Sequence, residues 1–151
     1  PIKFRFDMAC AGRLGMELQP KQMNAEEKAF ARKAIESYKG YRDIVMEGDL
    51  YRIGTPYDDT GYYGVMYVSK DKKKAVLFTY CTLYQSRTLV PKYRLYGLDA
   101  QTRYRIREQN VDKKRFWFDG GTFTGEYLNH AGINPNLNKI YDSAVFVLEA
   151  E

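Results

Sequence analysis

The sequence is poor in the residues that build most metal and disulfide sites. It contains two cysteines, Cys10 and Cys81, and one histidine, His130. Two cysteines are too few for a disulfide framework, and neither has the paired spacing of a metal site. Both lie among apolar residues, so we expect buried free thiols. We predict no metal site and no cofactor.

Long apolar runs and clustered charge are also lacking. No apolar stretch approaches the roughly 20 residues that cross a bilayer, so we expect no membrane partner. The net charge is +5, and the basic excess is spread along the chain, whereas nucleic-acid binders concentrate it on one stripe. The tightest run, Lys70 with Lys72, Lys73 and Lys74, is predicted to be a solvated hairpin tip. A basic, Tyr-rich nucleic-acid binder is therefore the weakest of three hypotheses.

The composition is that of a folded domain. Hydrophobic residues make up 44% and charged residues 28% of the 151 residues, values typical of globular chains and not of disordered ones. This length accommodates one domain, or one domain with part of another. The 14 tyrosines favour strands, because tyrosine suits half-buried pleated surfaces.

The first 47 residues are predicted to form a strand followed by a helix. Residues 4–18 mix apolar with small residues, which in a strand suggests close approach of another backbone or a ligand. Asn24 and Glu27 have the spacing of a capping box, so a helix starts there and ends by Gly48. Its expected apolar face comprises Phe30, Ala34, Tyr38, Tyr41 and Val45.

From Asp49 onward the chain is predicted to be all β. The expected strands are 50–53, 64–68, 75–83, 92–96, 104–108, 115–118 and 144–149. Turn residues separate them, notably Ser69-Lys-Asp-Lys-Lys-Lys74, Gly97-Leu-Asp99, Asp119-Gly-Gly121 and Asn134-Pro-Asn136. Many short strands with frequent turns are typical of an antiparallel sandwich. We therefore predict a mainly β chain with two parts, 1–47 and a sandwich domain at 48–151.

An ordered set of motifs resembles the C-terminal part of bacterial α-galactosidases of glycoside hydrolase family 36. The motifs are Asp7-Met-Ala9, Gly12-Arg-Leu-Gly-Met-Glu-Leu18, Tyr38-Lys39, Gly48-Asp-Leu-Tyr-Arg-Ile53, Met66-Tyr-Val-Ser69, Gly97-Leu-Asp99, Tyr104-Arg-Ile106 and Gly125-Glu-Tyr-Leu128 with Gly132. The resemblance runs nearly the whole length. It implies that residues 1–47 are the closing strand and helix of a (β/α)8 catalytic barrel, followed by the C-terminal sandwich.

The resemblance also implies a division of labour within a longer parent enzyme. Such enzymes are retaining glycosidases that use two aspartates, one as nucleophile and one as acid/base, and both would precede Pro1 together with the sugar-contacting cysteine segment. No position of this chain matches them, so we assign no catalytic, substrate-binding or metal residue. Cys10 is not the sugar-contacting cysteine, because it lies downstream of the acid/base position.

Several residues invite a catalytic interpretation that their sequence context does not favour. Asp58 and Asp59 are adjacent, so in an extended segment they point to opposite faces and cannot flank one bond; we expect a turn. Asp7 suits a buried role, with an ion pair to Arg5 or Arg13 favoured over catalysis. His130 has no ligand partners in sequence and is expected in a loop.

An aromatic set invites a sugar-binding interpretation. It comprises Phe116, Trp117, Phe118, Tyr62, Tyr63 and Tyr67. Aromatic residues in strands more often serve core and cross-strand packing, which we favour here. An exposed row of at least two rings would instead indicate a carbohydrate-binding module.

The leading hypothesis is the C-terminal part of an α-galactosidase that hydrolyses terminal α-D-galactosyl residues by a retaining mechanism. The sandwich would be structural and the chain inactive alone, with the parent enzyme's barrel and N-terminal domain as partners and an α-galactoside reached through the parent. The alternative is a non-catalytic carbohydrate-binding β-sandwich module. We expect residues 1–47 either to pack against the sandwich or to contact a second copy in a homo-oligomer. Compartment is left open.

Overall fold

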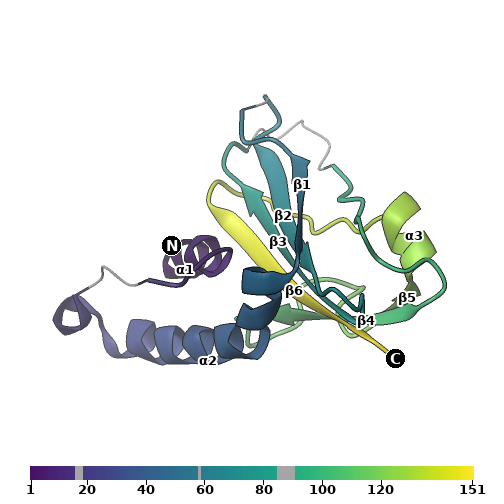
Figure 1. The fold of residues 1–151 in the computed structure, drawn as a ribbon. Helices are drawn as coiled ribbons and strands as arrows, with labels where there is room; N and C mark the ends of the chain where they lie inside the picture. Colours follow the sequence, from purple (N-terminus) through teal and green to yellow (C-terminus); the bar gives the residue numbers. More distant parts are fainter. Residues whose placement is uncertain (16–18, 58, 85–90) are drawn as a thin grey trace.

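The structure is a computed structural model that describes residues 1–15, 19–57, 59–84 and 91–151. Its helices are α1 (Ile2–Cys10), the 3₁₀ helix η1 (Pro20–Gln22), α2 (Ala25–Glu47) and α3 (Gly125–His130). Its strands are β1 (Asp49–Gly54), β2 (Tyr62–Val68), β3 (Lys74–Cys81), β4 (Arg103–Gln109), β5 (Thr122–Thr124) and β6 (Asp142–Ala150). Figure 1 shows the sheet between the N-terminal helices and α3.

The six strands form one antiparallel sheet in the order β1-β2-β3-β6-β4-β5. The C-terminal strand β6 is inserted between β3 and β4, so it is central and its backbone is paired on both sides. The predicted mainly antiparallel β architecture is confirmed. The named strands form one sheet and not two packed sheets: in the described residues, helices cover one face, and loops with α3 cover the other (Figure 1).

One face of the sheet carries a large apolar core, here called the loop face. Alternate residues of the strands point into it, including Met66, Leu77, Ile106 and Phe146, each fully buried. The residues that cover them from outside the strands are Tyr93, Leu95, Leu98, Phe118, Leu128, Ile133 and Leu137. The period-2 alternation of the sequence thus places one set of side chains in this core.

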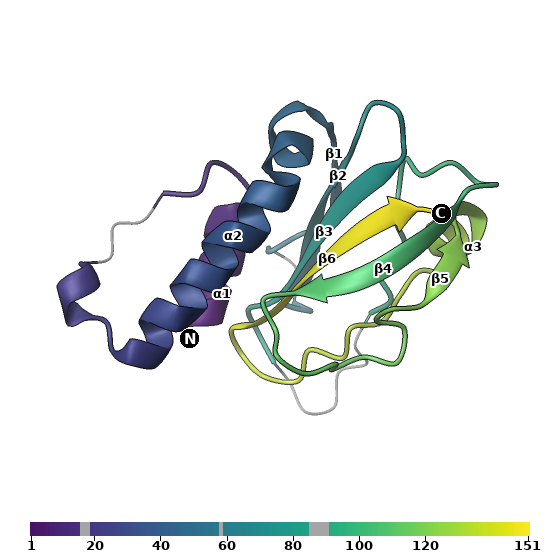
Figure 2. The same ribbon diagram turned by 90° about the horizontal axis from the view of Figure 1, so that it is seen from below.

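The opposite face, here called the helix face, is covered by α1 and α2. Val76, Phe78, Tyr80 and Val145 pack there in one cluster with buried residues of both helices. The helices contribute Cys10, Tyr38, Tyr41, Ile44 and Val45. The expected packing of residues 1–47 against the β domain is therefore confirmed (Figure 2). Strand β3 is buried on both faces, which explains its continuous apolar character.

Helix α2 follows its sequence signals closely. The Glu27 backbone N–H donates to Asn24 Oδ1 at 2.9 Å, and the Asn24 N–H donates to Glu27 Oε2 at 3.0 Å, which completes the predicted capping box. The helix ends at Gly48, whose backbone is extended. A Cβ at this position would lie 2.4 Å from the Ile44 carbonyl oxygen and 2.7 Å from that of Val68. This glycine is required by close approach and has an ordinary negative φ.

The strand expected at residues 4–18 is wrong: residues 4–10 lie in helix α1, and residues 11–15 form a turn, bends and irregular backbone. Phe6, Asp7 and Cys10 are the buried residues of α1, a spacing that fits one side of a helix. The residues that pack against α1 lie far away in the sequence. The ring centroids of Phe6 and Phe30 are 5.7 Å apart and those of Phe4 and Tyr80 are 5.9 Å apart, both edge-on. Residues 16–18 of the expected strand lie outside the described residues.

Two further predicted strands are also wrong. Residues 92–96 form a single bridge, between Tyr93 and Ile133, and residues 115–118 form bends and turns. In the second segment Phe118 is buried and stacks on Phe116 at 5.5 Å, so the aromatic run anchors a loop. Strand β5 and helix α3 were not predicted, because both are short.

The predicted hairpin tip between β2 and β3 is confirmed. The Lys74 carbonyl accepts from the Ser69 backbone N–H at 2.8 Å, and Lys72 has a positive φ of 58°. The described part of the chain holds no helix with the length and apolarity to cross a membrane.

Candidate functional site

A buried polar cluster, the Asp7 cluster, joins α1 to the β domain. Asp7 is fully buried; its carboxylate accepts from Asn110 Nδ2 at 3.0 Å and from Ser143 Oγ at 2.7 Å. It also pairs with Lys3, one turn earlier. The predicted buried role is confirmed, but the expected partners Arg5 and Arg13 are wrong. Lys3 takes their place because residues four apart share one side of a helix.

A second cluster lies beside it around Arg115. The Arg115 Nε donates to Glu108 Oε1 at 2.8 Å, and its Nη1 donates to Asp142 Oδ1 at 3.0 Å. Its Nη2 donates to the Ser143 carbonyl at 2.6 Å. Burial raises the pKa of Glu108 above its ordinary value, although the Arg115 guanidinium acts in the opposite direction. Both carboxylates are committed to one guanidinium, so they form an ion-pair network and not an acid/base pair.

Sequence reasoning missed Asn110, Arg115 and Ser143. No spacing signal connects them, since Asn110 and Ser143 lie 103 and 136 positions from Asp7. The local signal is the residue type at position 110: in the structure, Asn110 adopts a positive φ of 59° just after β4. Asparagine tolerates this conformation better than most residues do.

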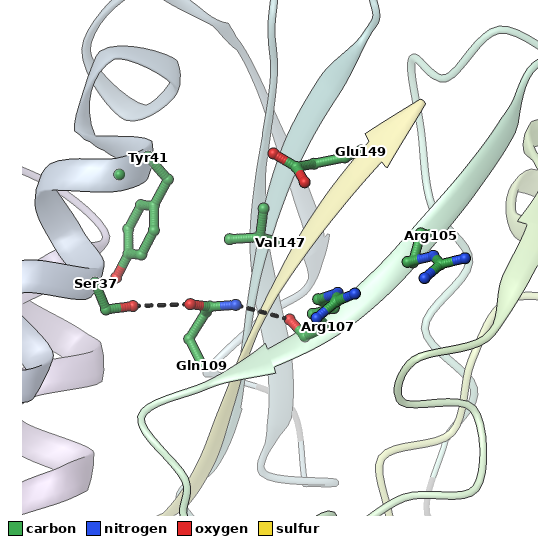
Figure 3. A pocket seen from close by; sticks show the side chains of 8 residues that line it. Ser37, Tyr41, Arg105, Arg107, Gln109, Val147 and Glu149 are labelled. Carbon is green, nitrogen blue, oxygen red and sulfur yellow. Dashed lines mark hydrogen bonds between the residues drawn. The ribbon is translucent and has the colours of Figure 1, made fainter. Parts of the chain in front are cut away.

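A cleft of about 240 Å³ lies where the helix face is left open, between α2 and strands β4 and β6. Figure 3 shows its lining: Ser37, Gly40 and Tyr41 from α2, Arg105, Arg107 and Gln109 from β4, and Val147 and Glu149 from β6. Ser37 Oγ and Gln109 Oε1 lie 2.9 Å apart in a hydrogen bond across it.

The chemistry of this cleft does not fit glycoside hydrolysis. A retaining glycosidase needs two carboxyl groups roughly 5 Å apart on either side of the scissile bond. The lining holds one carboxylate, Glu149, which is paired with Lys74 at 3.2 Å. The cleft is instead the uncovered part of the helix face, where β4 presents arginines in place of apolar residues.

The residues that invited a catalytic interpretation lie apart from one another. Asp59 is exposed in a turn, as predicted, and Asp58 lies outside the described residues. His130 is the exposed last residue of α3, not part of a loop. Among the described residues, no group of three His, Cys, Asp or Glu side chains could hold a metal ion.

Both cysteines are buried free thiols, as expected. Burial raises the pKa of the Cys10 thiol to about 11 and also raises that of Cys81. Because the thiolate is the reactive form, both side chains are poor nucleophiles at neutral pH.

The aromatic residues divide between core and surface. Tyr62 and Phe118 are buried. Tyr63 and Tyr67 lie under the N-terminal segment, where the Tyr67 hydroxyl donates to the Ala11 carbonyl at 2.6 Å. Trp117 is different: it is 72% exposed. The prediction that these aromatic side chains serve packing is thus confirmed for most of them, with Trp117 as the exception.

The structure is a mainly β domain with N-terminal helices packed on its sheet. Among the described residues, Glu108 and Asp142 are bound by Arg115, and the cleft beside α2 holds a single carboxylate, Glu149. A family model described as the glycosyl hydrolase family 36 C-terminal domain matches residues 62–148, more than half of the chain. The chain therefore belongs to this family. The resemblance seen in the sequence is confirmed.

Similar proteins extend the match to the whole chain. The sequence is 30% identical to a probable α-galactosidase G of Aspergillus terreus, covering 100% of this chain and 19% of the relative. It is 32% identical to α-galactosidase 2 of Hypocrea jecorina, over 99% of this chain and 19% of that protein. The solved structure of the family 36 α-galactosidase AgaA from Geobacillus stearothermophilus with raffinose is similar at a TM-score of 0.85 and 26% identity, over 99% of this chain and 19% of that one. The chain thus spans about a fifth of the length of these relatives.

Proposed function

We propose that this chain is the C-terminal part of an α-galactosidase that hydrolyses terminal α-D-galactosyl residues with retention of anomeric configuration. The observation that carries this proposal is the full-length match to proteins named α-galactosidases, of which the chain represents 19%. The remaining length of such a parent has room for a catalytic domain. Its other parts are the chain's principal partners, and the α-galactoside is reached through them.

We further propose that residues 1–47 are the end of the parent's catalytic barrel, to which the described residues contribute helices α1 and α2 and not the expected closing strand. Two observations support this assignment. The relative from Aspergillus terreus matches 100% of the chain, so residues 1–47 have a counterpart in a protein named as an α-galactosidase, although they lie outside residues 62–148 matched by the family model. The Asp7 cluster and the helix-face core then make a rigid connection between this segment and the β domain.

In this proposal the β domain is structural and the chain alone is inactive. The buried carboxylates Glu108 and Asp142 are held by Arg115, and the cleft of Figure 3 has a single carboxylate. A double-displacement mechanism needs one carboxyl group as nucleophile and a second as acid/base. Those groups are proposed to reside in the barrel of the parent.

The test compares the purified chain with the enzyme encoded by its complete reading frame. The complete enzyme is expected to release galactose from raffinose, and proton NMR of the first product should show the α-anomer. The chain at equal molarity is expected to release none above buffer. Galactose release by the chain, or the β-anomer as first product of the complete enzyme, would overturn the corresponding part of the proposal.

A further inference from the structure

An apolar surface stays partly exposed along one flank of α1, beside the sheet. Met8 is 42% exposed, and Tyr141, in the turn before β6, is 52% exposed. The Phe4 and Tyr141 rings meet edge-on with their centroids 5.3 Å apart, and Tyr63 Oη lies 3.7 Å from Met8 Sδ. Phe4 and Met8 are four residues apart and so lie on the same side of the helix. The surface formed by Phe4, Met8, Tyr63 and Tyr141 is here called the α1-flank patch.

The other flank of α1 faces α2. Ile2 and Phe6 pack in one cluster with residues of α2, among them Phe30. Each helical residue advances the side-chain direction by about 100°. This rotation places Ile2 and Phe6 on one side of the helix, and Phe4 and Met8 on the other. Helix α1 thus has α2 against one flank, whereas the flank with the α1-flank patch is partly open.

The backbone at Tyr141 indicates that its side chain has a role beyond the turn. Its φ of 61° is in the left-handed region, which bulky residues rarely adopt and glycine or asparagine adopt more readily. The Tyr141 N–H donates to the Cys81 carbonyl at 2.8 Å, so the turn is fixed to the end of β3. The aromatic ring is therefore not explained by the backbone. Beside the Met8 thioether, which adapts its shape to a neighbour, it offers an apolar surface for packing.

The barrel geometry of the proposed parent supplies the occupant of this surface. In a (β/α)8 barrel the helices form an outer ring, so each helix lies between two others. If α1 and α2 are consecutive members of that ring, α2 is one neighbour of α1. The second neighbour then lies along the opposite flank, where the α1-flank patch is. The chain spans 19% of its relatives' length, so most of such a ring lies outside it.

We propose that the α1-flank patch is the docking surface for the second barrel helix that neighbours α1 in the parent enzyme. This inference rests on the proposed function, since it takes residues 1–47 as part of the barrel. Tyr63 and Tyr141 belong to the β domain, so the β domain contacts a barrel helix outside this chain as well as α1 and α2. That helix covers the apolar side chains which the chain alone leaves exposed.

Hydroxyl-radical footprinting with mass spectrometry tests this contact by comparing the 151-residue chain with the complete parent enzyme. Oxidation of Met8 and Tyr141 should be about fivefold slower in the complete enzyme, because a packed interface excludes water and oxidant. Tyr127, 41% exposed on α3 across the sheet from α1 (Figure 1), is the matched control and should be oxidised equally in both. Met66 is fully buried and should be protected in both, which checks that the chain is folded.

A substitution separates docking from packing within the chain. Met8→Glu places a charge in the proposed interface and should lower the melting temperature of the complete enzyme by about 3 °C. The same variant of the 151-residue chain should shift by less than about 1 °C, because the position is largely exposed there. Tyr127→Glu should shift neither protein. Equal shifts of the chain and the enzyme by Met8→Glu would overturn the proposal.

Photo-crosslinking identifies what covers the surface. A photo-reactive methionine analogue at Met8, in a mixture of isotopically labelled and unlabelled complete enzyme, should crosslink to a barrel helix of the same polypeptide. A crosslink to a second copy or to the N-terminal domain would overturn the proposal, as would full oxidation of Met8 and Tyr141 in the complete enzyme. These readouts need no hydrolysis. An active enzyme with an oxidisable Met8 contradicts the docking surface alone, and an inactive enzyme with a protected Met8 contradicts the α-galactosidase activity alone.

Discussion

The two faces of the sheet are closed in different ways. The loop face is covered by segments between residues 92 and 137 that lie within the β region itself, with Phe118, Leu128 and Leu137 fully buried. The helix face depends on residues 1–47, which cover β2, β3 and β6. Over β4 it stays partly open, and the cleft of Figure 3 lies there.

This difference shows which of the two cores depends on the N-terminal segment. The loop face would keep its core if the N-terminal segment were removed, whereas the helix face would lose half of its cluster. The boundary at residues 47 and 48 therefore separates two stretches of sequence that share one core. Residues 1–47 and 48–151 are therefore coupled by packing and not only by the chain.

Deletion of residues 1–47 should give the largest effect. It exposes Val76, Phe78, Tyr80 and Val145, all buried beneath the helices, and exposed apolar patches of this kind promote association. Residues 48–151 are expected to aggregate or bind a hydrophobic dye strongly, as measured by size-exclusion chromatography and dye fluorescence. A soluble monomer with the melting temperature of the full chain would contradict the dependence of this face on the helices.

The Asp7→Ala variant should have the next largest effect. Its removal leaves Asn110 and Ser143 without a buried acceptor, and breaking a buried charged network costs about 3 kcal/mol. Urea denaturation should show this decrease in the free energy of unfolding. Asp43→Ala, in α2 with its side chain 86% exposed, is the control and should change stability by less than about 0.5 kcal/mol.

Alkaline pH should weaken the helix face through Cys10. Burial raises the pKa of the Cys10 thiol to about 11 in the folded chain, above its ordinary value of 9.0. Unfolded chains lose the thiol proton as pH rises above about 9, whereas folded chains keep it until about 11. This contribution is thus fully present below the lower value and is lost as pH rises toward the upper one, by on the order of 2 kcal/mol.

Denaturation curves across that pH range measure the decline, to which other buried thiols and phenols also contribute. Cys10→Ala should make it shallower than in the original chain, because the buried ionisable thiol is gone. An unchanged slope in the variant would show that Cys10 does not contribute.

Asn24→Ala should produce the smallest effect, confined to the start of α2. Loss of the cap removes the acceptor for the Glu27 N–H and typically costs about 1 kcal/mol. Thermal denaturation should show a small decrease in melting temperature. Gln22→Ala, exposed just before the helix, should have none, and an equal decrease in both variants would argue against a capping effect.

Local signals predicted part of this fold correctly. The capping box of Asn24 and Glu27 and the glycine at position 48 are local signals, so both ends of α2 could be placed from sequence. The apolar alternation of β2, β4 and β6 identified them for the same reason. Helix α1 could not be recognised, because the buried side that contains Phe6 and Cys10 is chosen by α2 and by the sheet.

The polar clusters were beyond sequence reasoning for a related reason. Asp7 could be identified as a buried carboxylate, but Asn110 and Ser143 reach it only after the sheet has placed β4 and β6 side by side. Trp117 is exposed in a segment where residues 115–118 do not form the predicted strand.

Native-state hydrogen exchange tests most directly whether α1 and α2 are part of the β domain's core. Amides in the middle of α2, around Tyr38 and Tyr41, are expected to exchange with the same opening free energy as those of β3 and β6, because they share one cluster. Asp7→Ala should lower these values together. If α2 instead exchanged through a separate opening of much lower free energy, with β3 unaffected, the two segments would be independent and the shared core would be refuted.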